Sequence, residues 1–279
     1  MHLIRTVAEM QQATATVKRS GRRVALVPTM GALHEGHAAL IRKARERGAA
    51  VVVSIYVNPT QFGPTEDFKN YPRDLDKDCE LCVRETVDAV FAPADADMYA
   101  GEASTWVEET RLSHRLEGER RPHHFRGVCT VVAKLFNIVQ PDAVVFGQKD
   151  YQQLKVVERL ARDLSYPIEI VSAPTARAPD GLALSSRNQY LSAEERAQAT
   201  VLSRALHVAL DLFNEGERNA HRLETAMLRT VQFAPAARLD YAEIADAHTL
   251  EPVHEASRGN VALLAAYIGK TRLIDNLIL

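Results

Sequence analysis

Residues 24–37 constrain the fold of this chain more than any other stretch, because they join a buried strand to a helix through a glycine turn. The apolar run from Val24 to Val27 has the length and β-branched content of a buried strand. Pro28 is predicted to end that strand's hydrogen-bonded ladder, since it has no N–H to donate. Gly31 supplies a hinge, and a helical pattern starts at about Glu35. The stretch is the first half of a βαβ unit.

The start of that helix is a candidate phosphate site. A helix N-terminus presents N–H groups and the positive end of a dipole, both of which attract anions. His34 and His37 are three residues apart and are expected on one face of the first turn. A His-x-x-His pair can also ligate a metal, but a third ligand is not obvious, and the neighbouring glycines favour backbone approach to a phosphate.

The rest of the chain repeats the strand–helix alternation and then changes character. Strands are predicted at 49–57, 89–91, 143–146 and 167–171, with helices at 5–19, 74–85, 128–139 and 151–164. This alternation predicts an α/β fold with a Rossmann-like, doubly wound parallel sheet. Beyond a polar loop at 174–192, one long helix at 193–214, a second at 220–231 and strands at 239–244 and 261–268 predict a smaller C-terminal α+β domain. We expect domains at 1–175 and 176–279.

Composition excludes several classes of partner. A net charge of −2 gives no electrostatic reason to expect nucleic acid or a membrane surface. No apolar run approaches the 18 residues of a membrane span, and no signal peptide is recognisable at the N-terminus. Three cysteines fit a reducing cytoplasm rather than a disulfide framework. Cys79 and Cys82 form a C-x-x-C, but we interpret them as part of a plain helical face, since two further zinc ligands are not found nearby.

Three further groups lie where ligands bind in parallel sheets, outside the carboxyl ends of strands or at a helix start. Gln61 follows the predicted strand at 49–57, and Lys149 directly follows the strand at 143–146. A basic cluster at 120–126 precedes the apolar helix at 128–139 and is predicted to attract an anion. The alternative for the glutamine and for the basic cluster is an ordinary solvated loop.

Common nucleotide motifs are incomplete in this sequence. Gly31 and Gly36 have the spacing of a P-loop, but His37 and Ala38 replace the lysine and the Ser/Thr that phosphate and magnesium require. The G-x-G-x-x-G dinucleotide fingerprint is missing, and the Gly-Lys-Thr at 269–271 is predicted to be a turn. These replacements argue against a P-loop phosphotransferase.

What remains is His-x-Gly-His after a strand, Lys149 at a later strand end, and Ser185-Ser186-Arg187 in the loop between the domains. This combination resembles the nucleotidyltransferase superfamily shared with class I aminoacyl-tRNA synthetases, which pairs H-x-G-H with a mobile lysine- and serine-containing loop around ATP. Longer strings resemble the pantothenate synthetase (pantoate–β-alanine ligase) family in order along nearly the whole chain. They are PTMGALHEGH at 28–37, NPTQF at 58–62, YPR at 71–73, FGQKDYQQ at 146–153, GLALSSRN at 181–188 and AAYIGKTRLIDN at 265–276.

The resemblance implies an enzyme that joins pantoate to β-alanine at the expense of ATP. The pantoate carboxylate first attacks the α-phosphorus to form pantoyl adenylate and pyrophosphate, and the amine of β-alanine then displaces AMP. Charge develops on phosphoryl oxygens in the first step, which needs positioned donors rather than a covalent nucleophile. The resemblance also implies Mg²⁺ with the ATP, a cytoplasmic location and a homodimer, with small-molecule substrates as the partners.

It implies the following site residues. The catalytic residues are His37 as proton donor, His34 and Lys149. The pantoate site is Gln61 and Gln153, with Gln61 also contacting β-alanine, and Arg121 and His124 fall near the substrates. The metal position is Asp78, although Lys77 stands beside it and most coordination is expected from ATP oxygens and water. Leu184 stands where the family often has methionine. The ATP-binding residues are Pro28, Met30, Gly31, Ala32, Leu33, His34, Glu35, Gly36, His37, Gly147, Gln148, Lys149, Asp150, Ala176, Leu184, Ser185, Ser186 and Arg187.

Two other functions remain open from the residues alone. One is a nucleotidyltransferase that stops at the adenylated product, and the other is a non-catalytic nucleotide-binding module.

Overall fold

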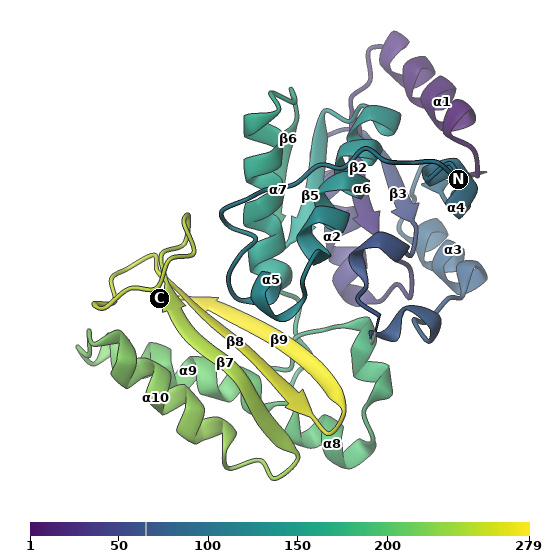
Figure 1. The fold of residues 1–279 in the computed structure, drawn as a ribbon. Helices are drawn as coiled ribbons and strands as arrows, with labels where there is room; N and C mark the ends of the chain where they lie inside the picture. Colours follow the sequence, from purple (N-terminus) through teal and green to yellow (C-terminus); the bar gives the residue numbers. More distant parts are fainter. Residues whose placement is uncertain (65) are drawn as a thin grey trace. The chain divides into compact units, whose positions relative to one another are not determined.

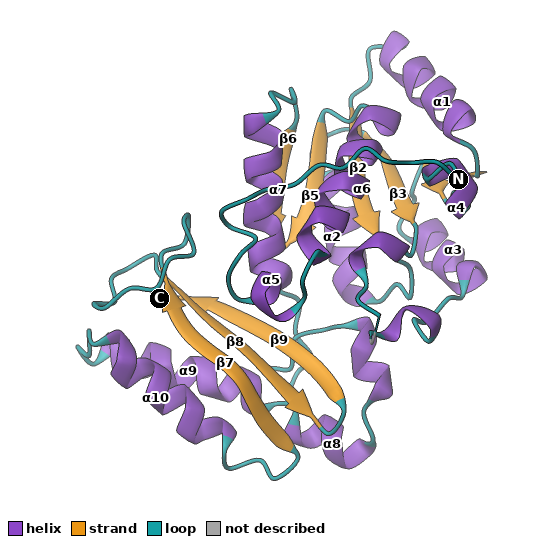
Figure 2. Cartoon of the chain, in the orientation of Figure 1, coloured by secondary structure: helices purple, strands orange, loops and turns teal. Residues whose placement is uncertain are grey.

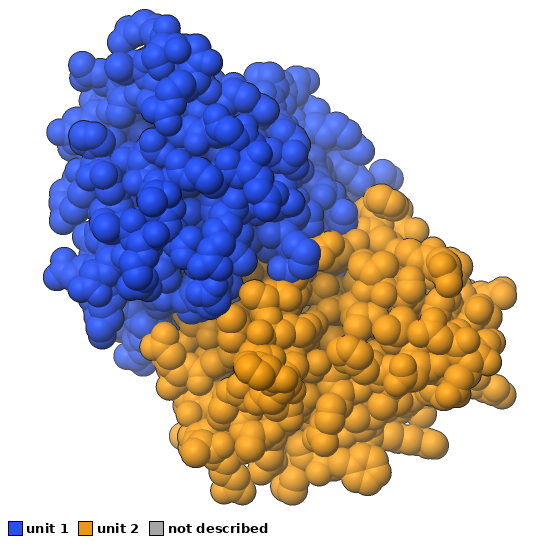
Figure 3. Space-filling model, turned by 180° about the vertical axis from the view of Figure 1, so that it is seen from behind, with its two compact units in different colours: residues 1–147, 152–174 blue, residues 148–151, 175–279 orange. Residues whose placement is uncertain are grey.

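A computed structural model describes residues 1–64 and 66–279 of the chain. The chain divides into two compact units, coloured separately in Figure 3. The first unit comprises residues 1–147 and 152–174, and the second comprises residues 148–151 and 175–279. The short segment 148–151 therefore belongs with the C-terminal unit and not with the predicted N-terminal domain at 1–175. Among the described residues, no helix is long and apolar enough to cross a membrane.

The first unit is built on a six-stranded sheet in which every pairing is parallel, in the order β1-β4-β3-β2-β5-β6 (Figure 1). The doubly wound α/β architecture predicted from the sequence is confirmed. Its strands are β1 (His2–Ile4), β2 (Val24–Thr29), β3 (Ala50–Ile55), β4 (Ala89–Phe91), β5 (Ala143–Gly147) and β6 (Glu169–Ala173). Its helices are α1 (Val7–Arg19), α2 (Glu35–Arg45), α3 (Leu75–Arg84), α4 (Asp95–Met98), α5 (Glu117–Arg120), α6 (His124–Val139) and α7 (Tyr151–Asp163, whose first residue belongs to the second unit).

Both faces of this sheet are covered, which explains why its central strands are apolar throughout. Ala25 and Val27 of β2 pack in one cluster with Ile41 of α2 and Cys82 of α3. The alternate residue Leu26 is also fully buried and faces the opposite side, because side chains alternate along a strand. Helices α1 and α6 pack against each other and against β2. Cys82 is thus part of a buried helical face, as the sequence analysis interpreted it.

The predicted end of the first strand at Pro28 is wrong. Strand β2 continues to Thr29, and Pro28 pairs with Ser54 of β3. On its other side β2 pairs with β5 only at Ala25 and Leu26. Pro28 therefore lies where β2 has a single partner, and a residue without an N–H is tolerated in a strand that is open on one side.

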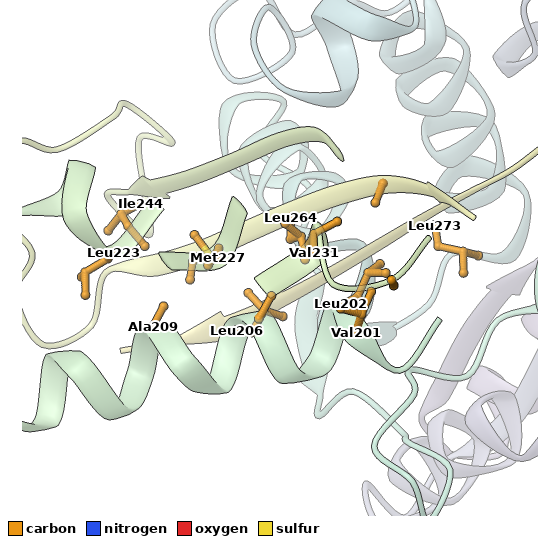
Figure 4. Packing of buried hydrophobic residues seen from close by; sticks show 14 of the residues in the cluster. Val201, Leu202, Leu206, Ala209, Leu223, Met227, Val231, Ile244, Leu264 and Leu273 are labelled. Atoms are coloured by element: carbon orange, nitrogen blue, oxygen red, sulfur yellow. The ribbon is translucent and has the colours of Figure 1, made fainter. Parts of the chain in front are cut away.

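The second unit is a three-stranded antiparallel sheet, β7-β8-β9, with helices packed on it (Figure 2). Leu206 of α9 and Met227 of α10 are fully buried against Ile244 of β7 and Leu264 of β8 (Figure 4). This unit thus has a hydrophobic core of its own. Its elements are α8 (Ala193–Gln198), α9 (Val201–Asn214), α10 (Ala220–Val231), β7 (Ala237–Ala245), β8 (Val261–Ile268) and β9 (Thr271–Ile278).

Other details of secondary structure also differ from the predicted ones. The helix expected at 193–214 is two helices, and Thr200 lies between them with its hydroxyl donating to the carbonyl of Ala197. Such a bond competes with the regular helical pattern. Strand β9 was not predicted, although the turn at 269–271 that leads into it was. Strand β1, which pairs with β4, was also missed.

Candidate active site

The glycine turn after β2 is held by a buried carboxylate from α3. Gly31 and Ala32 both have positive φ angles, of 84° and 51°. The carboxylate of Asp78 accepts the N–H of Ala32 on Oδ2 at 3.0 Å and the N–H of Leu33 on Oδ1 at 2.7 Å. A Cβ added to Gly31 would lie 2.9 Å from Asp78 Oδ2. A side chain at that position is therefore excluded both by the backbone conformation and by the carboxylate.

Asp78 is only 3% exposed, and this burial raises the pKa of its carboxyl group, against the opposing effect of the Leu33 and Ala32 N–H bonds. Each carboxylate oxygen already accepts a backbone N–H group of the loop. Mg²⁺ requires near-octahedral oxygen coordination and usually takes one or two carboxylates together with phosphate oxygens. Among the described residues no group of three His, Cys, Asp or Glu side chains could hold a metal ion. The protein groups around Asp78 therefore do not fit a dedicated magnesium site.

The two histidines form a reciprocal cap at the start of α2. His34 is the N-cap residue, and its Nδ1 accepts the N–H of Gly36 at 3.1 Å. His37, three residues later, accepts the N–H of His34 on its own Nδ1 at 3.2 Å. This is a capping box in which imidazoles take the usual places of Ser/Thr and Glu/Gln. The ring centroids are 4.2 Å apart, so the prediction that both side chains lie together is confirmed.

This cap fixes where each imidazole carries its proton. A ring nitrogen that accepts a hydrogen bond is unprotonated, so in each ring the proton lies on Nε2. Both half-buried rings are held on the first turn of α2, where the helix dipole is positive. The arrangement gives two Nε2–H donors on a helix terminus, which suits hydrogen bonding to an anion.

Gln61 lies in a short 3-10 turn, η1 (Pro59–Gln61), that follows β3, and its amide is oriented by neighbours. The Oε1 atom accepts a hydrogen bond from Asn58 Nδ2 at 3.0 Å, and Nε2 lies 3.2 Å from Met30 Sδ. Asn58 is 1% exposed, and its Oδ1 accepts from the Tyr99 hydroxyl. Because Asn58 donates to the amide oxygen, the Gln61 amide N–H groups point toward the loop that carries Met30.

The main chain of Gln61 is held by part of the basic cluster at 120–126. His124 Nδ1 lies 2.8 Å from the Gln61 carbonyl, and its Nε2 lies 3.1 Å from Arg121 Nη1. Arg121 also makes a bidentate ion pair with Glu66, at 2.6 and 2.9 Å. A Cβ on Gly127 of α6 would come 2.3 Å from the Thr60 carbonyl, so η1 rests directly on that helix. Arg121, one of the cations that we predicted to attract an external anion, is engaged by Glu66.

His124 makes stability sensitive to acid. Burial, reinforced by Arg121, lowers the pKa of His124 from 6.5 to about 4. Because the His124 pKa is lower in the folded than in the unfolded protein, the unfolded state binds the proton first as the pH falls. The free energy of unfolding is therefore highest above about pH 6.5 and decreases as the pH falls from 6.5 toward 4. We expect the free energy of unfolding to drop by roughly 2 kcal/mol between about pH 7.5 and about pH 5 from this group alone. The variant His124→Asn retains a donor for the Gln61 carbonyl but has no group that titrates in this range. Urea titrations of wild type and of this variant at several pH values give the free energies of unfolding, and the difference between their pH dependences is the contribution of His124. Equal pH dependence in the two proteins would contradict it.

Two consecutive glutamines at the start of α7 have different environments. Gln152 is buried, and its amide accepts the N–H of Glu117 and donates to the carbonyls of Leu112 and Arg115. It therefore fixes the loop before α6. Gln153, the predicted pantoate ligand, is half-buried on the same turn. Gln61 and Gln153 both belong to the first unit.

In the second unit, the segment 148–151 carries three predicted ATP ligands, Gln148, Lys149 and Asp150. Lys149 Nζ is 3.3 Å from Asp150 Oδ1, and the Lys149 side chain is 20% exposed. The carbonyls of Gln148 and Lys149 both accept hydrogen bonds from Asn276 Nδ2, at 2.9 and 2.8 Å. Gly147, the last residue of β5, is half-buried.

The other predicted ATP ligands of this unit lie on a hairpin-like turn. The N–H of Leu184 donates to the carbonyl of Ala176 at 2.9 Å, so these residues meet although eight positions apart. Ser185 caps the following 3-10 turn, η4 (Ser186–Tyr190), by accepting the N–H of Arg187. Lys149 and Ser185 line the same small pocket, together with Ala183, Asn188 and Asp275. The structure thus brings together two motifs that are 36 residues apart in the sequence.

The family model for pantoate–β-alanine ligase matches residues 2–278. The chain belongs to this family. A pantothenate synthetase of Moorella thermoacetica is 52% identical over 279 residues, which is 100% of this chain and 99% of that protein. A pantothenate synthetase of Thermotoga neapolitana is 50% identical and is matched over the full length of both chains.

Solved structures of the family have the same fold. The pantothenate synthetase of Thermus thermophilus superposes with a TM-score of 0.94 at 45% identity, covering 99% of each chain. The pantoate–β-alanine ligase of Francisella tularensis, complexed with β-γ ATP and β-alanine, gives a TM-score of 0.82 at 33% identity and covers 100% of this chain and 97% of that one. The pantoate–β-alanine ligase fold therefore includes both units of this chain.

Sequence reasoning about this ligase missed several residues that hold the site together. Asn58, Arg177 and Asn276 lie within or beside the family strings, yet none of them received a role. The signal for Asn58 was available, because an Asn before Pro at a strand end typically caps a turn. The partners of Asp275 and Asn276 come from distant segments, which a local pattern does not reveal.

Proposed function

We propose that this pantoate–β-alanine ligase condenses pantoate with β-alanine at the expense of ATP, through a pantoyl adenylate, and releases AMP and pyrophosphate. The observation that carries the proposal is the family match over residues 2–278, with the His-x-Gly-His element intact as a paired imidazole cap. The Francisella relative, complexed with β-γ ATP and β-alanine, supports two of the substrates.

In the adenylation step, the N-terminus of α2 would stabilise phosphate charge. Attack of the pantoate carboxylate at the α-phosphorus transfers negative charge to the leaving pyrophosphate. His34 and His37 each direct an Nε2–H donor from the helix terminus, and His37 would donate its proton as the charge develops. The backbone from Pro28 to Gly36 would lie along the phosphates, with its shape fixed by Asp78.

Substrate orientation would come from amide side chains. Gln61 and Gln153 can donate and accept at once, which suits a hydroxy-acid such as pantoate. Asn58 sets the direction of the Gln61 amide, and we propose that Arg121 and His124 act on the substrates through the Gln61 main chain. Once the adenylate forms, β-alanine beside Gln61 attacks the acyl carbon, the C–N bond forms and AMP leaves with the electron pair of the broken C–O bond.

The second unit would contribute further contacts to ATP. Lys149 would bind phosphate through its ammonium group, and Asp150 would accept from the ribose hydroxyls. Ala176, Leu184 and the Ser185–Arg187 stretch would complete the nucleotide contacts of this unit. Gln148, and Gly147 of the first unit, would supply backbone groups. In functional terms, residues 1–175 would bind nucleotide and pantoate and residues 176–279 would act as a lid domain.

We base the proposed Mg²⁺ requirement, homodimeric state and cytoplasmic location on the resemblance to the family. Mg²⁺ would reach the protein as the ATP complex and supply charge neutralisation on the phosphates, with water and phosphate oxygens as its ligands. The enzyme would be a homodimer located in the cytoplasm, and a reducing compartment would suit its three free cysteines, two of which are buried. Sedimentation of the purified protein tests the dimer.

Isotope exchange between pyrophosphate and ATP tests the function. We expect exchange only when pantoate is present, and pantothenate only when β-alanine is added as well. Exchange without any amide product would indicate a nucleotidyltransferase that stops at the adenylate. ATP binding without exchange would indicate a non-catalytic module. Either result would overturn the proposal.

A further inference from the structure

The C-terminal strand β9 carries two buried polar residues that the proposed reaction does not use. Asp275 is 3% exposed and Asn276 is 7% exposed. Polar side chains are seldom buried unless they are hydrogen-bonded, because desolvation is costly. Their partners therefore indicate what these residues do.

Asp275 holds the hairpin-like turn that precedes Ser185. Its carboxylate makes a bidentate ion pair with Arg177, at 2.6 and 2.8 Å. Arg177 Nη1 also donates to the carbonyl of Gly181 at 3.0 Å, inside the turn. Arg177 and Ala183 form an isolated antiparallel bridge, two residues before Ser185. The position of the Ser185–Arg187 stretch is thus fixed to β9.

Asn276 holds the segment that carries Lys149. Its Nδ2 donates to two successive carbonyls, those of Gln148 and Lys149, at 2.9 and 2.8 Å. These carbonyls belong to the 3-10 turn η3 (Gln148–Asp150). Both donors of one buried amide are therefore used to fix the backbone from which the lysine side chain extends.

The two anchors are adjacent on a single strand, and the segments that they hold line one pocket. Lys149, Ala183 and Ser185 contribute to that pocket, and so does Asp275 itself. Strand β9 is paired with β8 over its whole length. A shift of the η3 backbone relative to the serine loop would break the hydrogen bonds of Asp275 or those of Asn276.

We propose that Asp275 and Asn276 are positioning residues, which fix the distance between the Lys149 ammonium and the Ser185–Arg187 stretch so that both contact the same ATP. The inference rests on the proposed function, since it gives these residues a task in adenylation. Asn276 acts through Lys149, and Asp275 acts through Arg177.

A double-mutant cycle between Asn276 and Lys149 tests the proposal. In pantoate-dependent pyrophosphate exchange, Asn276→Ala should lower kcat/KM for ATP by about tenfold, the loss expected for two hydrogen bonds that hold a charged ligand group. In the Lys149→Ala background the same change should cost less than about twofold, because the ammonium that Asn276 positions is gone. Asn276→Ser, which keeps a polar group of smaller volume, is made in parallel in case the alanine variant does not fold.

Asn260 offers a matched control in the same unit. It is also a buried asparagine, 7% exposed, and its side-chain oxygen accepts the N–H and hydroxyl of Ser257. Asn260→Ala should lower the melting temperature but leave kcat/KM for ATP within about twofold of wild type. Two results would overturn the inference: an Asn276 change with unaltered exchange kinetics, or full multiplication of the two effects in the double variant. Absence of exchange in wild type would instead overturn the proposed function.

Discussion

Replacing His37 by alanine should reduce the rate of pantoate-dependent pyrophosphate exchange by roughly 10²–10⁴-fold, the range for loss of a positioned acid. His37 accepts the His34 N–H on Nδ1, which places its proton on Nε2, on the first turn of α2. The alanine variant loses this donor together with half of the capping box. The cap loss alone should lower stability by about 0.5–2 kcal/mol.

His37→Gln separates the two losses. Glutamine is a usual residue at this place in a capping box and can accept the His34 N–H, but it has no imidazole. We expect the glutamine variant to keep the wild-type melting temperature and to lose activity nearly as much as the alanine variant. His248→Ala, which removes an exposed histidine of the second unit, controls for histidine loss in general and should be fully active. Near-wild-type exchange by His37→Gln would remove the imidazole from the mechanism.

The elements with strong local patterns were predictable. Val51 to Val53 form an unbroken β-branched run, and that run lies in a central strand buried on both faces. The His-x-Gly-His spacing placed both rings on one turn, as found. The reciprocal cap was beyond prediction, because which ring nitrogen accepts a backbone N–H depends on side-chain rotation rather than on spacing.

The misassigned parts depend on partners far away in the sequence. Strand β1 is three residues long and exists through pairing with β4. Strand β9 contains Asp275 and Asn276, which break an apolar strand pattern and are buried only because Arg177 and the 148–149 backbone satisfy them. The charge of Arg121 suggested an anion site, whereas Glu66, 55 positions earlier, neutralises it. A local window does not contain both members of such a pair.

Asp78→Asn is expected to disturb the glycine turn and adenylation together. The aspartate accepts the N–H groups of Ala32 and Leu33 on separate oxygens, and asparagine can accept only one of them. Its amide N–H₂ would face the other N–H in a buried site, which leaves donors unsatisfied. The free energy of unfolding should fall by about 2–4 kcal/mol, because a charge-assisted bond is lost and a buried N–H loses its partner.

Magnesium titration distinguishes the two roles available to Asp78. If the carboxylate acts by shaping the turn from Gly31 to Leu33, exchange by Asp78→Asn should fall by at least about tenfold at every Mg²⁺ concentration, because the turn itself has changed. If it were a metal ligand, excess Mg²⁺ would restore activity by mass action. Asp76→Asn makes the same charge change on an exposed residue of α3 and should behave as wild type in both assays. Since both oxygens of Asp78 accept backbone N–H groups and the side chain is only 3% exposed, we expect no rescue. The carboxylate then acts on ATP through the backbone that it holds.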